Sequence, residues 1–136
     1  MGATRVLKAA AALLLAVALG ACSRPAVPEV DPPDWNFGSI PSSHVAKKQV
    51  EIRNPGSRSV TLRFISTCDC LRAVGAPGQL AAGQTAAVEL SYDPAGRSGF
   101  EEAALIVVAV RGRRESRTAL RVHGKVLPAG VGSPAP

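Results

Sequence analysis

The sequence predicts an all-β fold, a sandwich of immunoglobulin type with about seven short strands in residues 34–126. Apolar and polar residues alternate with period two in several runs, helical periodicity is weak, and turn-forming segments separate the runs. The 136-residue chain contains 13 glycines and 11 prolines, which suit many turns rather than long helices. A length near 100 residues is enough for one sandwich core.

The alternating runs define the expected strands in order. They lie around residues 35–40, 50–53, 60–64, 88–92, 103–110 and 120–122. The turn signals Asn54-Pro55-Gly56-Ser57 and Asp93-Pro94-Ala95-Gly96 separate strands along the chain. Residues 103–110 are apolar on both faces, which is typical of a central strand.

The same alternation assigns side chains to faces. The expected core consists of Val50, Ile52, Val60, Leu62, Phe64, Val88, Leu90, Leu105, Val107, Leu120 and Val122. The side chains expected to face water are those of Glu51, Arg53, Thr61, Arg63, Glu89, Arg121 and Lys125. Trp35 is expected to fill the core rather than to stack on a ligand.

Residues 1–21 have the pattern of a secretory signal peptide. Arg5 and Lys8 precede an unbroken apolar run, residues 9–20, and small residues lead to Cys22. The run is shorter than the roughly 20 apolar residues of a spanning helix, which disfavours the alternative of an uncleaved membrane anchor. Cys22 and the residues before it resemble the lipobox of bacterial lipoproteins, which implies a cysteine carrying fatty-acyl chains such as palmitate.

A lipoprotein signal places the mature protein outside the cytoplasm, where disulfides persist. Ser23 after the cysteine favours, by the same resemblance, the outer membrane facing the periplasm where an organism has two membranes. The formal charge of +6 falls to +4 without residues 1–21, because 14 basic and 10 acidic residues remain. Expected partners are the membrane, through the N-terminal lipid, and an envelope protein, but not nucleic acid.

The domain organisation follows from composition. Residues 22–33 hold the lipidated cysteine and a proline-rich tether, which at about 3.1 Å per residue would keep the domain some 30 Å from the bilayer. Residues 34–126 form the sandwich, and residues 127–136, rich in Pro, Gly and Ala, are expected to be a disordered tail.

Several motifs resemble, in order and spacing, a bacterial family catalogued as domain of unknown function 1573. They are Trp35-Asn36-Phe37-Gly38-Ser39-Ile40, Asn54-Pro55-Gly56, Ser66-Thr67-Cys68-Asp69-Cys70, Gly83, Tyr92-Asp93-Pro94 and Gly124. That family is similar to the immunoglobulin-like domains of Hydin-type ciliary proteins and of pilus chaperones. The resemblance covers residues 33–126 and implies a pilus-chaperone-like sandwich, without implying an activity.

Cys68 and Cys70 are the two cysteines that remain beside Cys22. On an extended chain, residues two apart point to one face, so their sulfurs can meet. Three interpretations stay open: an inert structural disulfide, a labile disulfide used in thiol exchange, and a Cu(I) site, since Cu(I) prefers sulfur and tolerates few ligands. His44 and His123 are candidate third ligands, although exposed polar positions suit both better.

No nucleophile-elbow, metalloprotease or phosphate-loop motif is present in the sequence, so an enzyme is not expected. The arginines at 111, 113, 114 and 117 cluster around an expected hairpin, either as a solvated loop or as a contact to an anionic lipid or polymer. The sequence predicts a non-catalytic interaction or structural module with no cofactor. The alternative is a periplasmic thiol-redox or copper-binding protein that uses Cys68 and Cys70.

Overall fold

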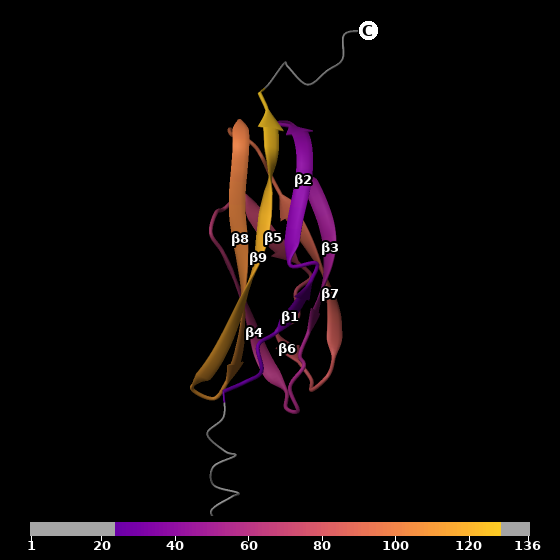
Figure 1. Cartoon of the computed structure of the whole chain (residues 1–136), viewed down its shortest axis with the longest axis vertical. Helices are drawn as coiled ribbons and strands as arrows, with labels where there is room; N and C mark the ends of the chain where they lie inside the picture. Colours follow the sequence, from indigo (N-terminus) through magenta and orange to yellow (C-terminus); the bar gives the residue numbers. More distant parts are fainter. Residues whose placement is uncertain (1–23, 129–136) are drawn as a thin grey trace, which may run out of the picture.

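The computed structural model describes residues 24–128, which form nine strands in two sheets with no helix among them (Figure 1). The strands are β1 (Glu29–Asp31), β2 (Asp34–Pro41), β3 (Ala46–Arg53), β4 (Val60–Ser66), β5 (Leu71–Val74), β6 (Gln79–Leu80), β7 (Thr85–Tyr92), β8 (Gly99–Arg111) and β9 (Arg114–Leu127). Within this range no helix is long and apolar enough to cross a membrane. Residues 1–21, which the sequence predicts to be a signal peptide, lie outside the described residues, as do Cys22, Ser23 and residues 129–136 of the expected tail.

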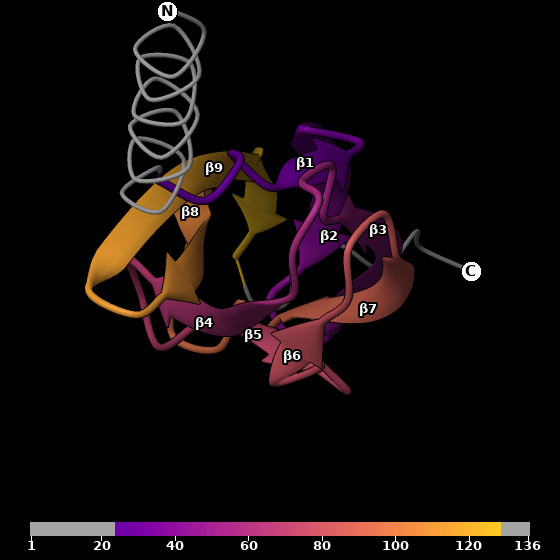
Figure 2. The ribbon, with the colours of Figure 1, turned by 90° about the horizontal axis from the view of Figure 1, so that it is seen from below.

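The first sheet has the strand order β1-β3-β7-β5 and is antiparallel throughout. Its central pair places Val50 opposite Val88, and both side chains are buried. The residues directly before and after Val50 and Val88 in their strands face water, as the period of two requires. Figure 2, which looks along the strands, shows β3 and β7 as one layer of the sandwich.

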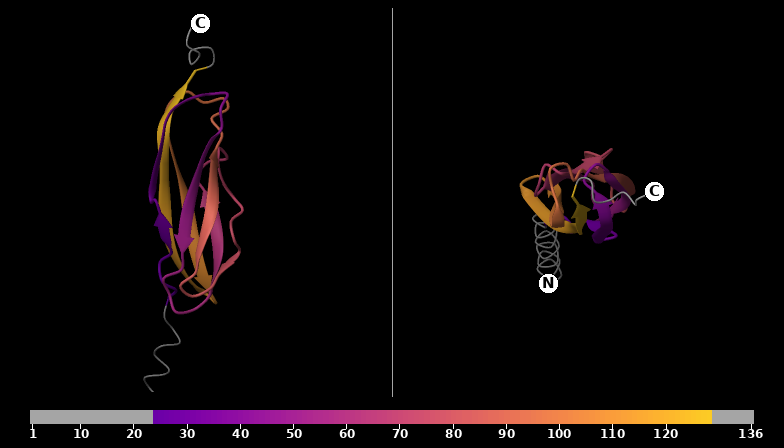
Figure 3. Two further views of the ribbon diagram at one scale, coloured as in Figure 1. Left: turned by 90° about the vertical axis from the view of Figure 1, so that its right-hand side faces the viewer. Right: turned by 90° about the horizontal axis from the view of Figure 1, so that it is seen from above.

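The second sheet has the order β2-β9-β8-β4-β6. Its framework is the long hairpin of β8 and β9, paired from Gly99 opposite Val126 to Arg111 opposite Arg114. Strand β2 runs parallel to β9 and forms one edge of the sheet. The strands run along the long axis of the molecule, with the hairpin tip at one end and the C-terminal end of β9 at the other (Figures 1 and 3).

The core confirms the predicted faces. Ten of the eleven expected core residues are buried, and Phe64 is partly buried against the same cluster. The seven residues expected to face water are all exposed. Trp35 is buried as expected, with 8% of its surface accessible. The predicted immunoglobulin-like sandwich is therefore confirmed, with nine strands in place of about seven.

The N-terminal boundary differs from the expected one. Residues 29–31, assigned to the tether by their proline-rich context, form β1 and pair with β3 through Val30 and Ile52. Pro25 and Pro28 are buried, and the Ser116 hydroxyl donates a hydrogen bond to the Pro25 carbonyl oxygen. Strand β1 itself contains no proline, since Pro28 and Pro32 flank it, so its ladder lacks no N–H group. The folded body therefore begins near Pro25 rather than at Asp34.

Candidate functional site

The outer face of β2, β9 and β8 carries the most distinctive group of exposed side chains. A bulge in β2 shifts its register against β9 between Asn36 and Ser39, and Gly38 there has a φ of +75°. The Asn36 side-chain oxygen accepts a hydrogen bond of 2.8 Å from the Gly38 N–H, which holds the bulge. Trp35 and Phe37 point toward the core by ordinary alternation, and the bulge lets Ser39 face outward like Asn36.

An aromatic stack lies beneath this face. The rings of Phe37 and Tyr92 are stacked with centroids 4.6 Å apart, and Trp35 meets Phe37 edge-on at 6.1 Å. Burial raises the pKa of Tyr92, and nearby Glu101 raises it further. The Tyr92 hydroxyl is buried without a hydrogen-bond partner in the described structure. The stack therefore gives the face a rigid, mainly apolar support.

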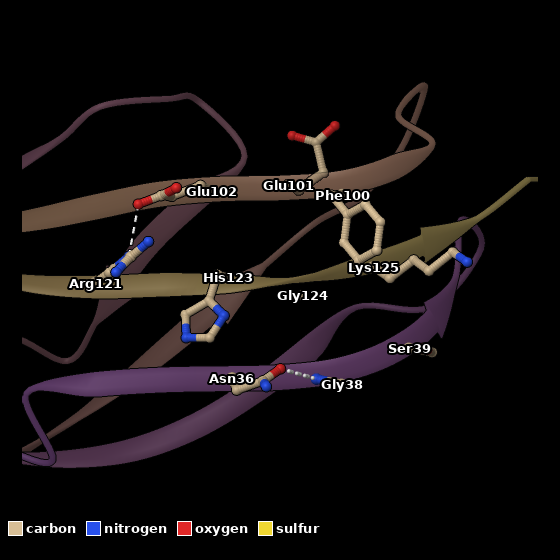
Figure 4. A pocket seen from close by; sticks show the side chains of 10 residues that line it. All are labelled: Asn36, Gly38, Ser39, Phe100, Glu101, Glu102, Arg121, His123, Gly124 and Lys125. Carbon is tan, nitrogen blue, oxygen red and sulfur yellow. Dashed lines mark hydrogen bonds and ion pairs between the residues drawn. The ribbon is translucent and has the colours of Figure 1, made fainter.

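Phe100 stands above this support and is the most exposed large apolar side chain described, with 87% of its surface accessible. The Lys125 ammonium lies 5.5 Å from its ring centroid, within range of a cation–π contact. Both residues border a shallow groove of about 490 Å³ (Figure 4). We call it the Phe100 groove; it is lined by Asn36, Gly38, Ser39, Phe100, Glu101, Glu102, Arg121, His123, Gly124 and Lys125.

An ion pair and a contact between a histidine and a carboxylate form one side of the groove. Arg121 Nε lies 2.6 Å from Glu102 Oε1, and a hydrogen bond with that carboxylate raises the pKa of Arg121. His123 Nε2 lies 3.0 Å from an Asp34 carboxylate oxygen. The groove therefore combines one exposed aromatic ring with polar side chains, of which Arg121 pairs with Glu102 and His123 contacts Asp34.

One feature of this groove follows from the sequence alone. Phe100 falls on the same alternation as Glu102 and opposite to the buried Ala103 and Leu105, so its outward position follows from period two. By contrast, the bulge at Gly38 breaks the alternation in β2 and turns Ser39 outward, and the pairing of β2 with β9 decides this position. The assembly of the groove from β2, β8 and β9 was not visible in any one segment.

The predicted cysteine pair lies elsewhere, on the crossing from β4 to β5. Cys68 and Cys70 lie at disulfide distance from each other, with their Cα atoms 5.2 Å apart; Cys70 is buried and Cys68 partly buried. The Asp93 N–H donates to the Cys70 carbonyl oxygen at 2.8 Å, and Arg97 lies 3.6 Å from the exposed carboxylate of Asp69. The pair thus belongs to the half of the molecule away from the hairpin tip.

The two histidines are not brought together with the cysteines. His123 lies in the Phe100 groove and His44 in the turn before β3, where it contacts the Ser43 hydroxyl at 3.2 Å. Among residues 24–128, no group of three or more His, Cys, Asp or Glu side chains is placed to hold a metal ion. The arginine cluster forms the tip of the β8–β9 hairpin, as expected, and Arg117 lies within β9.

Comparison with solved structures gives the fold independently. The ASH/PapD-like domain 7 of human CEP192 is 14% identical with a TM-score of 0.65, covering 75% of this chain and 86% of that one. A protein of unknown function from Porphyromonas gingivalis W83 is 18% identical with a TM-score of 0.61, covering 75% of this chain and 47% of that one. The E. coli chaperone DraB is 8% identical with a TM-score of 0.58, covering 79% and 59%.

These identities show the shared fold alone, and this chain spans about half of the Porphyromonas protein and three-fifths of DraB. A search of curated proteins finds no match. The family model for the HYDIN/CFA65/VesB-like, Ig-like domain matches residues 26–125, which covers nearly all of the described structure. The chain therefore belongs to the HYDIN/CFA65/VesB-like family of immunoglobulin-like domains.

Proposed function

We propose that the protein is a bacterial envelope lipoprotein whose domain acts as a non-catalytic protein-interaction module through the Phe100 groove. The observation that carries this proposal is the 87% exposure of Phe100 in a domain whose other aromatic side chains are buried or partly buried. An immunoglobulin-like sandwich fits such a non-catalytic module. The resemblance to domain of unknown function 1573 supports a bacterial setting.

The groove has the composition of a protein-binding hot spot. Binding energy at interfaces concentrates on a few aromatic or arginine side chains that become fully desolvated, surrounded by a polar rim that excludes water. Phe100 supplies the aromatic anchor, and the Arg121–Glu102 and His123–Asp34 pairs supply the rim. The long β8–β9 hairpin holds these groups on a rigid element, which lowers the entropy lost on binding.

Site-specific photo-crosslinking in intact cells tests this proposal. A photoreactive amino acid at position 100 should yield a discrete protein adduct, whereas the same group at Val74, which is 49% exposed in the other sheet, should not. Placed at Ser39 across the groove, it should give the same adduct, and Phe100→Ala should abolish that adduct while leaving the unfolding midpoint unchanged. Identical adducts from positions 39 and 74 would refute a dedicated surface.

The lipid anchor is a separate part of the proposal, supported by the signal pattern and by Cys22. Replacing Cys22 with Ala should release the protein from membranes, and the N-terminal peptide of the wild-type protein should carry acyl chains by mass spectrometry. Persistence of Cys22→Ala in the membrane fraction would contradict lipidation at this residue. Separation of inner and outer membranes would test the outer-membrane location that Ser23 suggests.

A second candidate function is thiol exchange by Cys68 and Cys70, with Cu(I) binding as its variant. The disulfide distance and the partial exposure of Cys68 favour it. Intact-mass measurement with and without reductant, together with Cu(I) titration of the reduced protein, distinguishes a stable bridge, a labile bridge and a metal site. If Cys68→Ser/Cys70→Ser leaves the cellular phenotype of the wild type intact, this second function is lost.

A further inference from the structure

The first described residues pack at the end of the molecule where the tip of the β8–β9 hairpin lies. Pro25 is buried there, and its carbonyl oxygen accepts the hydrogen bond from Ser116 in β9. Figure 1 shows the chain entering beside this hairpin, at the end of the sandwich opposite the C-terminal end of β9. Only Ser23 and Arg24 lie between Cys22 and Pro25, so three steps of no more than about 3.6 Å each join the two residues. A lipid on Cys22 would therefore hold this end of the domain within roughly 10 Å of the bilayer surface.

This end is strongly basic. Arg24, Arg113 and Arg114 are exposed, and none of them takes part in an ion pair within residues 24–128. They border a shallow depression of about 510 Å³ together with Val27, whose surface is 55% exposed. Glu115, the acidic residue beside them, already binds Arg63 at 2.9 Å and Arg117 at 2.7 Å. The unpaired positive charge is thus not neutralised by its neighbours.

We propose that this basic end, comprising Arg24, Val27, Arg113 and Arg114, docks on the anionic phospholipid surface in which the protein is anchored. The inference rests on the lipid anchor of the proposed function. Guanidinium groups bind phosphate oxygens in a two-pronged geometry, and a basic residue near an anionic membrane contributes about 1 kcal/mol. Val27 adds an apolar contact at the depth of the headgroups.

Docking at this end fixes the orientation of the domain. The fourteen residues of β9 span about 45 Å at 3.4 Å per residue, from the hairpin tip toward the C-terminal end. Phe100 pairs with Lys125 near the far end of that strand, and the Phe100 groove would therefore lie at the end of the domain distant from the membrane. The domain would stand on the bilayer and present the groove to a partner, in place of swinging on a tether of some 30 Å.

The inference can be tested by hydrogen–deuterium exchange on the full mature lipoprotein in vesicles of phosphatidylcholine, alone or mixed with phosphatidylglycerol. Amides of residues 111–114 should exchange several-fold more slowly on the anionic vesicles, whereas those of the far turn, residues 93–97, should not change. The slowing should weaken at about 0.5 M salt because charges more than a few ångströms apart are then screened.

Charge-removing variants sharpen the test. The double variant Arg113→Gln/Arg114→Gln should lower the ratio of membrane-docked to undocked domains by about 30-fold, since each of the two arginines contributes about 1 kcal/mol. The matched control Lys48→Gln/Arg72→Gln removes two exposed charges elsewhere and should keep the slowing.

Each outcome decides one question. Equal exchange of residues 111–114 on neutral and anionic vesicles would overturn the docking, as would equal loss of slowing in both double variants. A failure of the anchor itself shows separately, as an N-terminal peptide without acyl chains. An acylated protein whose hairpin exchanges freely on phosphatidylglycerol would therefore refute the docking and leave the anchor standing.

Discussion

The ring of Phe37 occupies the position that a side chain at residue 124 would need. The aromatic stack therefore depends on a glycine at this position. A Cβ on Gly124 would lie 2.2 Å from Phe37 Cε2, and Phe37 cannot simply withdraw because its other side stacks on Tyr92. We expect Gly124→Ala to lower the free energy of unfolding by about 1–3 kcal/mol, as overpacking of a filled core does. Urea unfolding followed by Trp35 fluorescence measures the loss.

Gly78→Ala is the matched control for this substitution, because a Cβ at Gly78 would meet nothing within 4 Å and its φ is not positive. Its unfolding midpoint should stay close to that of the wild type. If Gly124→Ala proves equally harmless, the packing of Phe37 against β9 is wrong. The double variant Phe37→Leu/Gly124→Ala should recover part of the loss, since the shorter side chain frees the space.

At the residue scale, sequence patterns predict burial well and pairing poorly. The alternating runs place Val50, Leu62 and Val122 correctly because period two alone sets which face a strand residue occupies. The outward position of Ser39 depends instead on the bulge at Gly38, which lies opposite Gly124 where β2 pairs with β9, some eighty residues away along the chain. No local pattern carries that information.

Among the turns, Asn54 joins two connections that are distant in sequence. Its side-chain amide donates to the carbonyl oxygens of Arg58 at 2.8 Å and Leu80 at 3.1 Å, and its side-chain oxygen accepts from the Gly56 N–H at 3.0 Å. Asn54→Ala should destabilise the fold by about 2–4 kcal/mol, because buried backbone groups lose their partners. Chemical denaturation measures it.

Asn36→Ala serves as the control, since Asn36 is exposed and makes a similar short-range hydrogen bond to the Gly38 N–H. Exposed groups regain a partner in water, so the cost there should stay below about 1 kcal/mol. Equal losses for the two variants would mean that burial of Asn54 does not matter.

Near the hairpin tip, Glu115 of β9 forms ion pairs with Arg117 of the same strand and with Arg63 of β4. A hydrogen bond from Arg117 lowers the pKa of Glu115, and the charges of Arg117 and Arg63 lower it further. A depressed folded-state pKa stabilises the protein above the ordinary value of 4.5, and this contribution is lost as the pH falls through the folded-state pKa. Glu115→Gln should therefore lower the urea midpoint at pH 7, and the gap to the wild type should narrow below about pH 4.5.

The control for charge removal is Glu51→Gln, an exposed acid on the other sheet that forms no ion pair among the described residues. At pH 7 the urea midpoint of Glu51→Gln should differ less from that of the wild type than the midpoint of Glu115→Gln does. A gap for Glu115→Gln that stays constant from pH 7 to about pH 3 would show that its pairing with the arginines does not affect stability.

At the scale of elements, the strands with strong alternation were predictable and the short ones were not. Strands β3, β4, β7, β8 and β9 each contain an alternating or wholly apolar run. By contrast, β1, β5 and β6 have two to four residues each, too few for a period to show, and their pairing with β3, β7 and β4 defines them. The proline-rich composition of residues 23–33 pointed toward a tether because composition does not reveal that a neighbouring strand leaves an edge to fill.

For the whole molecule, the N-terminal boundary is the feature with the largest consequence. The buried Pro25 and Pro28 and the pairing of β1 with β3 close one edge of the first sheet. A chain beginning at Asp34, the boundary that the sequence predicts, would expose the edge of β3 and the apolar surface that these prolines cover. Exposed strand edges pair with other chains, so this shorter chain should also aggregate more readily.

We expect the chain beginning at Asp34 to be about 2–4 kcal/mol less stable than one beginning at Arg24, given the contribution of each buried apolar side chain. Urea unfolding of the two chains, with light scattering to follow association, measures both effects. A chain beginning at Arg24 with Val27→Ser is the control, since Val27 is 55% exposed and its loss should leave the midpoint almost unchanged. Equal midpoints for the chains that begin at Arg24 and at Asp34 would mean that β1 and the buried prolines do not stabilise the fold. The residues before Asp34 would then act as a flexible tether to the anchor, and the basic end would not need to rest on the bilayer.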